Sequence, residues 1–337
     1  MTREMDWVSY GKGIGIFLVV YGHLLSSSYN AGINIPEHFF VLSDSIVYSF
    51  HMPLFFLLSG IFVDQSLRKR GRRNFLLSKL KSIAYPYLIW SLLQTSMEVL
   101  FSSQTNYGIT KFDIFAVIYK PWAQFWFLYA LMWMHGMYTI ISKFERFSPI
   151  MLGLLAIALY FFPINTPIVA LQGFSINLLF FVGGIYLRKY VIDSGKNYTI
   201  PLWITIALFV VLFTSGIYIF ENLIEPTRLT KGTHPVYFLY LSVLGITACV
   251  GLSQYLSNLR KFRYIKIIGD YSLQIYLAHM LAGVAARMVL LKLFNLTNPL
   301  LHVSIVVLVA LVAPIVIYNL AKRIHFPYLF ELSKRSA

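Results

Sequence analysis

Ten long apolar stretches recur along the 337-residue chain, and they restrict its fold more than any other feature. A helix needs about 20 mostly apolar residues to cross the roughly 30 Å hydrocarbon core of a bilayer. Nine stretches have that length, whereas the fifth is shorter and is compatible with a tilted or re-entrant segment. The stretches cover residues 7–27, 40–63, 80–101, 123–142, 149–163, 168–187, 201–220, 234–254, 268–291 and 300–321. The pattern predicts an all-α polytopic membrane protein with ten transmembrane helices.

The composition excludes two other classes of protein. Only 12% of the residues are charged and 58% are hydrophobic, whereas soluble proteins are about 25% charged, so a soluble globular enzyme is excluded. The 28 Phe and 23 Tyr residues exclude a disordered chain, because disordered chains are poor in aromatic residues. A single cysteine, Cys249, leaves no internal disulfide and no cysteine-based metal site. We expect no metal.

Positive charge alternates between the two sides of the predicted helices. Cytoplasmic loops of membrane proteins carry an excess of Lys and Arg. The N-terminus, every second connection and the C-terminal tail hold 21 of the 28 basic residues, and the other connections hold five. We therefore predict that both termini are cytoplasmic. Topology accounts for most of the formal charge of +15, so no nucleic-acid partner is expected.

The connections between the stretches are short. The longest cover about residues 64–79 and 102–122, and neither is long enough for a separate domain. Residues 1–337 are therefore predicted to form a single transmembrane domain. Any chemistry then takes place inside the helix bundle or at its mouths.

Seven basic residues gather in the connection between the second and third stretches and at the start of the third. They are Arg68, Lys69, Arg70, Arg72, Arg73, Lys79 and Lys81. One interpretation is that they set the orientation of the chain and attract anionic membrane lipids. Their number exceeds what orientation needs, which favours a second interpretation, in which a polyanionic soluble ligand docks at this cytoplasmic mouth.

The first stretch carries two ionisable residues, which are costly inside a membrane and often functional. Lys12 and His23 are eleven residues apart, close to a whole number of helical turns, so both lie on one face. His23 is about 24 Å of helix rise beyond Trp7, in the outer half of the membrane. The alternative interpretation, that His23 is a structural histidine bonded to a neighbouring helix, has comparable weight on spacing alone.

Three further stretches carry polar residues at membrane depth. His51 stands just before Pro53, where we expect a kink, and either lines a cavity or satisfies the carbonyl group that the proline frees. Glu98 ends a polar face in the third stretch, and either binds a ligand or is hydrated at the interface. Tyr276 and His279 share a face of the ninth stretch. Three histidines in three helices are hard to explain by packing alone.

Short motifs follow one another in order along nearly the whole chain. They are Arg3-x-x-Asp6, Lys12-Gly13-Ile14, Val19-Val20-Tyr21-Gly22-His23, Phe50-His51-Met52-Pro53-Leu54-Phe55-Phe56, Pro86-Tyr87-Leu88-Ile89-Trp90, Trp126-Phe127-Leu128, Gly269-Asp270-Tyr271-Ser272-Leu273 and Ile275-Tyr276-Leu277 with His279. Together they resemble the membrane acyltransferase-3 family, and in particular its fucose 4-O-acetylase-like branch.

The resemblance implies a function and a location. Such proteins transfer an acyl group, commonly acetyl, from cytoplasmic acyl-CoA to a sugar or lipid-linked glycan of the cell envelope. It implies a multi-pass protein of the bacterial inner membrane whose substrates are acetyl-CoA and a glycan. Some family members add an extracellular esterase-like domain, and we expect none here.

The resemblance also implies roles for individual residues. It makes His23 catalytic and assigns the CoA phosphates to basic residues at the start of the third stretch. Many members carry Arg-x-x-Arg there, but this chain has Lys79-Leu80-Lys81-Ser82. We therefore assign the acyl-CoA contact to Lys79, Lys81, Arg72 and Arg73.

Acyl transfer from a thioester to a hydroxyl group needs a base for the hydroxyl proton and stabilisation of an oxyanion. A histidine suits the first role because its ordinary pKa is about 6.5. We hypothesise that His23 is the general base and that Lys12 faces the donor, beside an acidic partner such as Asp6. A covalent acyl-histidine is the rival mechanism. The residues that could line the acceptor pocket are His51, Glu98, Trp126, Tyr276 and His279.

A proton-coupled transporter or flippase of an anionic solute or glycan is the alternative function. Ten helices, central histidines and a basic cytoplasmic mouth suit such a carrier too. Transporters often contain repeats with paired broken helices, and the break at Pro53 has no counterpart in the second half of the chain. A non-enzymatic assembly subunit would have little reason to place histidines at membrane depth. Oligomeric state and the acceptor glycan stay open.

Overall fold

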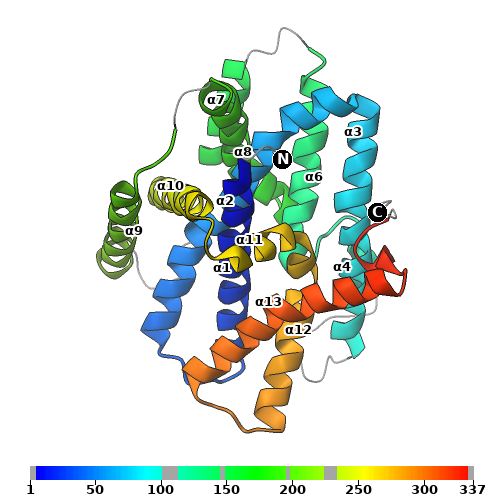
Figure 1. Ribbon diagram of the computed structural model, residues 1–337, viewed down its shortest axis with the longest axis vertical. Helices are drawn as coiled ribbons and strands as arrows, with labels where there is room; N and C mark the ends of the chain where they lie inside the picture. Colours follow the sequence, from blue (N-terminus) through cyan, green and yellow to red (C-terminus); the bar gives the residue numbers. More distant parts are fainter. Residues whose placement is uncertain (1–4, 101–112, 145–148, 195–197, 224–233, 333–337) are drawn as a thin grey trace. The chain divides into compact units, whose positions relative to one another are not determined.

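The computed structural model describes residues 5–100, 113–144, 149–194, 198–223 and 234–332 (Figure 1). Within these ranges the regular structure is entirely helical, which confirms the all-α class. Some residues used above lie outside them, including Arg3 of the first motif and the basic residues Lys334 and Arg335 of the C-terminal tail.

Thirteen α-helices are present in the described ranges. They are α1 (Asp6–Asn30), α2 (Glu37–Arg70), α3 (Arg72–Lys79), α4 (Tyr85–Leu100), α5 (Asp113–Ala116), α6 (Trp126–Ile141), α7 (Pro149–Phe161), α8 (Val169–Tyr186), α9 (Leu202–Asn222), α10 (Pro235–Leu259), α11 (Arg263–Asp270), α12 (Ser272–Lys292) and α13 (Pro299–Arg323). Two π-helical segments, Leu80–Ala84 and Leu187–Ile192, follow α3 and α8.

Seven of the described helices are long and apolar enough to cross a membrane, so the chain is a multi-pass membrane protein. They are α1, α2, α8 with the π segment that follows it, α9, α10, α12 and α13. The helix α7 has 13 residues, and α4 and α6 have 16 each. At 1.5 Å per residue these rise about 20–24 Å, less than the hydrocarbon core. Ten transmembrane helices and two cytoplasmic termini therefore stay predictions.

Two element boundaries differ from the sequence-based expectation. The connection expected at 64–79 is mostly helical, because α2 runs on to Arg70 and α3 begins at Arg72. Gly71 separates them with a φ of 70°, which glycine adopts without strain. The ninth stretch, expected from residue 268, is divided at Tyr271 into the end of α11 and the start of α12.

The chain divides into two compact units, and each is described by itself. The first unit comprises Met1–Leu58 and Lys189–Ile317, and the second comprises Ser59–Arg188 and Tyr318–Ala337. The divisions fall inside α2, after α8 and inside α13, so single helices contribute to both units.

The helix α1 is the centre of the first unit. It packs against α10, α11 and α12 (dark blue beside yellow and orange in Figure 1). Two glycines allow backbone-to-backbone approach between α1 and α11. A Cβ atom on Gly13 would collide with the Ile265 carbonyl, and one on Gly269 would collide with the Ser9 carbonyl. The start of the first helix is therefore held tightly against α11.

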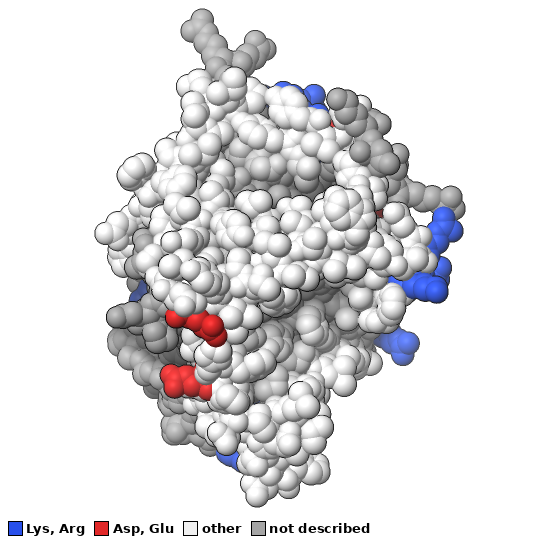
Figure 2. All heavy atoms as spheres, turned by 90° about the vertical axis from the view of Figure 1, so that its left-hand side faces the viewer, with Lys and Arg blue, Asp and Glu red and all other residues white. Residues whose placement is uncertain are grey.

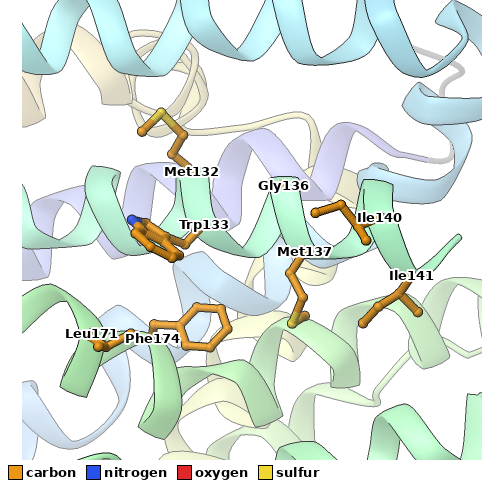
Figure 3. Close-up of a pocket in the computed structure, with 8 residues that line it drawn as sticks. All are labelled: Met132, Trp133, Gly136, Met137, Ile140, Ile141, Leu171 and Phe174. Carbon is orange, nitrogen blue, oxygen red and sulfur yellow. The ribbon is translucent and has the colours of Figure 1, made fainter.

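In the second unit, α8 packs against α6 and α7. Gly173 of α8 leaves space for the Trp126 ring, which a Cβ atom would strike. Residues of α6 and α8 line a groove of about 560 Å³, drawn in Figure 3. Among the eight lining residues, the Trp133 ring supplies the one side-chain nitrogen, so the groove is apolar and offers no catalytic group.

Large apolar side chains face outward, as expected for a protein in lipid. The helix α9 exposes Trp203, Ile206, Val210 and Phe213. Uncharged side chains dominate the face shown in Figure 2, where Lys, Arg, Asp and Glu are few. A soluble protein rarely exposes large apolar patches, whereas a bilayer covers exposed apolar side chains such as those of α9.

Candidate active site

Histidine rings from three helices meet in the first unit. The ring centroids of His23 on α1 and His279 on α12 are 5.4 Å apart. The Tyr48 ring on α2 lies 5.8 Å from that of His23 and 4.8 Å from that of His51. We call these four residues, His23, Tyr48, His51 and His279, the histidine cluster. The three histidines that the sequence singled out are therefore brought together.

Local sequence explains how Tyr48 reaches His23. A Cβ atom on Gly22 would lie 2.9 Å from the Tyr48 ring, so glycine leaves the space that the ring occupies. The Tyr48 hydroxyl oxygen then lies 3.2 Å from Nδ1 of His23. His51 is three residues beyond Tyr48, on the adjacent part of the same helical face.

A side chain from another helix hydrogen-bonds the carbonyl group that Pro53 leaves unpaired in α2. Pro53 has no N–H group, so the carbonyl of Ser49, four residues earlier, loses its helical partner. The Ser242 hydroxyl of α10 donates a hydrogen bond to that carbonyl. His51 instead bonds the Val47 carbonyl. Satisfying the freed carbonyl is therefore not the role of His51.

Backbone carbonyls fix the tautomers of two of the rings. Nδ1 of His51 lies 2.7 Å from the Val47 oxygen, and Nδ1 of His279 lies 2.8 Å from the Tyr276 oxygen and 3.1 Å from that of Ile275. A carbonyl oxygen only accepts hydrogen bonds, so in each neutral ring Nδ1 carries the proton and Nε2 is the acceptor.

His23 differs from the other two histidines in partner and exposure. Its Nδ1 faces the Tyr48 hydroxyl, which can donate or accept. His23 is partly exposed, whereas the side chains of His51 and His279 are buried. Within the described part of the chain, no three His, Cys, Asp or Glu side chains are placed to hold a metal ion. Among the three histidines of the cluster, His23 is thus the one that is not fully buried.

Lys12 lies on α1 eleven residues before His23, and its acidic neighbour is one that the sequence analysis did not single out. The carboxylate of Asp270, at the end of α11, interacts electrostatically with Lys12, and it accepts a hydrogen bond of 2.7 Å from the Ser9 hydroxyl. Asp6 pairs with Lys266 at 3.0 Å instead. Asp270 lies inside the predicted stretch 268–291, and a carboxylate within that stretch was the signal that could have identified it.

Two other polar residues of α12, Tyr276 and Arg287, make contacts of different kinds. The Tyr276 ring is buried one turn before His279, with the ring centroids 6.1 Å apart. Arg287, near the other end of α12, donates a hydrogen bond to the Ser27 carbonyl in the last turn of α1. A cation at a helix C-terminus is favourable, so Arg287 stabilises the packing of α1 on α12.

A polar cluster surrounds Glu98 in the second unit. The Glu98 carboxylate accepts hydrogen bonds from the Trp122 indole at 2.7 Å and from the Gln94 amide at 3.0 Å. Gln94 and Gln124 also bond each other, with Nε2 of Gln124 2.7 Å from Oε1 of Gln94. Both amides are buried. Glu98 is therefore a member of a network, and Gln124 is a member that sequence reasoning missed.

Trp126 and the basic residues assigned to acyl-CoA also lie in the second unit. Trp126 packs on Gly173. The ammonium group of Lys79 lies 5.2 Å from the centre of the Phe75 ring, and Arg72 donates to the Ser142 carbonyl at 2.9 Å. Arg73 and Lys81 are exposed. These residues belong to the second unit, whereas the histidine cluster belongs to the first.

Two buried histidines were missed by the sequence analysis. His135 on α6 packs against Phe75 and Phe181, and its Nδ1 bonds the Leu131 carbonyl. His302 on α13 bonds the Leu296 carbonyl through Nδ1. Both lie within predicted membrane stretches, so the rarity of ionisable residues there was a sufficient signal.

Comparison with known proteins assigns the chain to a protein family. The acyltransferase domain matches residues 5–319, nearly the whole chain. The chain belongs to the acyltransferase-3 family. This confirms the resemblance to that family, which the motifs had indicated.

One curated relative of this acyltransferase-3 protein is nodulation protein NolL of Mesorhizobium japonicum. The two are 25% identical over 177 residues, which is 52% of this chain. The matched region spans 45% of the length of NolL, less than half of that relative. No solved structure matches the chain.

Proposed function

We propose that this acyltransferase-3 protein moves an acetyl group from cytoplasmic acyl-CoA to a sugar hydroxyl of a cell-envelope glycan or lipid-linked glycan. The observation that carries the proposal is the meeting of His23 with Tyr48 and His279 inside one membrane unit. We further propose that the protein acts in the bacterial inner membrane. Family membership favours this enzyme over the transporter considered above.

In the proposed reaction His23 is the general base. The acceptor hydroxyl oxygen attacks the thioester carbonyl carbon while Nε2 of His23 takes the hydroxyl proton. The C–O bond forms, the C–S bond breaks, and the imidazolium returns the proton to the CoA thiolate, giving acetyl ester and free CoA thiol. The rival path forms an acetyl-histidine first, and label retained on the protein in the absence of acceptor distinguishes the two.

Tyr48 supports this role by orienting the imidazole. When Nδ1 of His23 donates to the Tyr48 oxygen, Nε2 keeps its lone pair and is available as a base. The arrangement follows the logic of hydrolases in which a third group holds the catalytic histidine in one tautomer. We propose Tyr48 as the positioning residue of His23.

The donor and acceptor sides are assigned to different groups. We propose that Lys79, Lys81, Arg72 and Arg73 bind the CoA phosphates, because Arg and Lys make strong charge-assisted hydrogen bonds to phosphate. Lys12, with Asp270 beside it, is proposed to face the donor.

In the first unit, we propose that His51, Tyr276 and His279 contact the acceptor. A separate proposal for the second unit, taken by itself, is that Glu98 and Trp126 contact a sugar group. In support, the network around Glu98 combines a carboxylate, amides and an indole ring. These groups provide the hydrogen bonds and apolar faces that a polar ligand needs.

Glycan analysis of cells tests the proposal. Envelope glycans of a strain that lacks the gene are compared with those of strains complemented by wild-type protein and by His23→Ala. We expect glycan O-acetyl content to return with the wild-type protein and not with the variant at equal membrane abundance. Equal O-acetylation by both proteins would contradict the role of His23, and saturable solute flux without acetylation would indicate the transporter.

A further inference from the structure

In His279, one ring nitrogen is held in the orientation of a hydrogen-bond acceptor. The carbonyls of Tyr276 and Ile275 both lie within 3.1 Å of its Nδ1. They hold the ring proton on Nδ1, so the lone pair of the neutral imidazole is on Nε2. The ring therefore presents an acceptor whose direction is set by α12 itself.

Nε2 of His279 is buried and has no hydrogen-bond partner among the described residues. Buried polar atoms in proteins are normally paired, and an exception needs an explanation. His302 also has a buried Nε2 without a partner in the described part of the chain, so an unpaired nitrogen alone does not identify a site. His279 differs because its ring lies 5.4 Å from that of His23, a residue of intermediate burial.

The spacing of the two rings limits what can bind them together. A hydroxyl group that donates to a ring nitrogen places its oxygen about 2.7–3.0 Å from that nitrogen. Rings whose centroids are 5.4 Å apart can hold two hydroxyl oxygens at neighbouring positions. A single molecule with hydroxyl groups on adjacent carbon atoms can present two oxygens at such a short spacing.

We propose that Nε2 of His279 binds a second acceptor hydroxyl adjacent to the one that reacts at His23, so that the enzyme selects acceptors with vicinal hydroxyl groups. The inference rests on the function proposed above and adds a substrate class to it. His279 touches the acceptor in this scheme but takes no proton from it. Pyranose rings carry such neighbouring hydroxyls, whereas a simple alcohol offers only one.

Small alcohols test the proposal without knowledge of the natural glycan. Purified protein in lipid nanodiscs is given radiolabelled acetyl-CoA with either 1,2-ethanediol or ethanol at equal hydroxyl concentration, and the labelled esters are quantified. We expect the wild-type protein to prefer the diol by about tenfold in kcat/KM, the effect of one buried hydrogen bond. We expect His279→Leu to lose that preference through a higher KM for the diol.

Two further variants separate a binding role from a packing role. His279→Gln places an amide oxygen near the position of Nε2, so we expect it to retain part of the preference for the diol. His302→Leu removes a histidine with the same bonding pattern but without contact to His23, and it should keep the wild-type preference. A wild-type protein that treats the two alcohols alike, including one that uses neither, overturns the inference, as does a His279→Leu variant that keeps the preference.

The outcomes also separate this inference from the proposed function. Release of CoA thiol that depends on His23, together with equal use of both alcohols, leaves the acyltransferase proposal in place and removes the role of His279. Failure of the wild-type protein to release thiol from acetyl-CoA under any condition removes the proposed function itself.

Discussion

Nδ1 of His23 lies 3.2 Å from the hydroxyl oxygen of Tyr48. The two residues come from different helices, and the contact joins the histidine of the cluster that is not fully buried to a side chain that can fix its tautomer. Gly22, the residue before His23, makes the approach possible. The orientation of the proposed base therefore depends on how α1 and α2 pack.

Replacing Tyr48 with phenylalanine tests the orienting role. Tyr48→Phe keeps the ring and removes the hydroxyl, so we expect kcat for acetyl transfer to fall about fivefold, as for loss of a hydrogen bond worth about 1 kcal/mol. The KM for acetyl-CoA should stay the same. Tyr21→Phe is the control, because it removes a 2.8 Å hydroxyl contact with Ser43 in the same unit. Unchanged kcat in Tyr48→Phe would show that the contact has no catalytic role.

Adding a methyl group at Gly22 tests the same contact from the other helix. The Cβ atom of Gly22→Ala would lie 2.9 Å from the Tyr48 ring, so the ring must move away from its place beside His23. We expect reduced kcat with normal membrane insertion. Gly136→Ala is the control because a Cβ atom there meets nothing within 4 Å. Equal loss of activity in both variants would point to a general effect on helix stability.

The approach of α1 to α11 predicts a larger effect on stability. The Cβ atom of Gly13→Ala would collide with the Ile265 backbone, which cannot rotate away as a side chain can. We expect destabilisation of about 1–3 kcal/mol, typical of overpacking, measured as a lower midpoint of thermal unfolding in detergent. Gly183→Ala, where space is open, should unfold at the wild-type temperature or above. A wild-type midpoint for Gly13→Ala would contradict the close packing.

The basic residues at the predicted cytoplasmic mouth should affect the binding of acetyl-CoA and not the rate of acetyl transfer. We expect Arg73→Gln and Lys81→Gln to raise the KM for acetyl-CoA several-fold while kcat stays the same, since exposed charge pairs contribute up to about 1 kcal/mol each. Higher salt should raise the KM of the wild-type protein more than that of the variants. Lys292→Gln, predicted to lie on the opposite side of the membrane, serves as the control. A fall in kcat without a change in KM would remove these residues from the donor site.

Reporter fusions test the predicted topology. Green fluorescent protein fused to either terminus should fluoresce, and alkaline phosphatase fused to either terminus should be inactive, because both termini are predicted to be cytoplasmic. Opposite results at the two termini would require an odd number of transmembrane helices and would exclude ten.

The apolar stretches predicted most membrane helices within a few residues, because hydrophobic length alone decides whether a helix can cross lipid. They could not predict that α12 begins at Ser272, or that Leu80–Ala84 is π-helical. Those features depend on local hydrogen bonding and packing, which hydropathy does not record. Hydropathy also predicts a connection from residue 64 onward, because the last turns of α2, up to Arg70, are polar although they are helical.

Helical spacing identified the face that Lys12 and His23 share, because the period of a helix is fixed by its backbone. It could not show which side chains of other helices meet that face. The contact of Tyr48 with His23 and the position of Asp270 near Lys12 depend on glycines that set helix rotation and distance. The bonding of Ser242 to the carbonyl freed by Pro53 is another contact between helices that spacing along one helix cannot give.

The rate of CoA thiol release from acetyl-CoA, measured with label transfer to envelope glycan on purified protein in nanodiscs, tests the central claim most directly. We expect the wild-type protein and His302→Leu to release thiol and label the glycan in equal amounts. We expect His23→Ala, folded and inserted at wild-type levels, to do neither above background. Transfer by His23→Ala at the wild-type rate would contradict the assignment of His23 as the base and also its rival role as the acyl carrier.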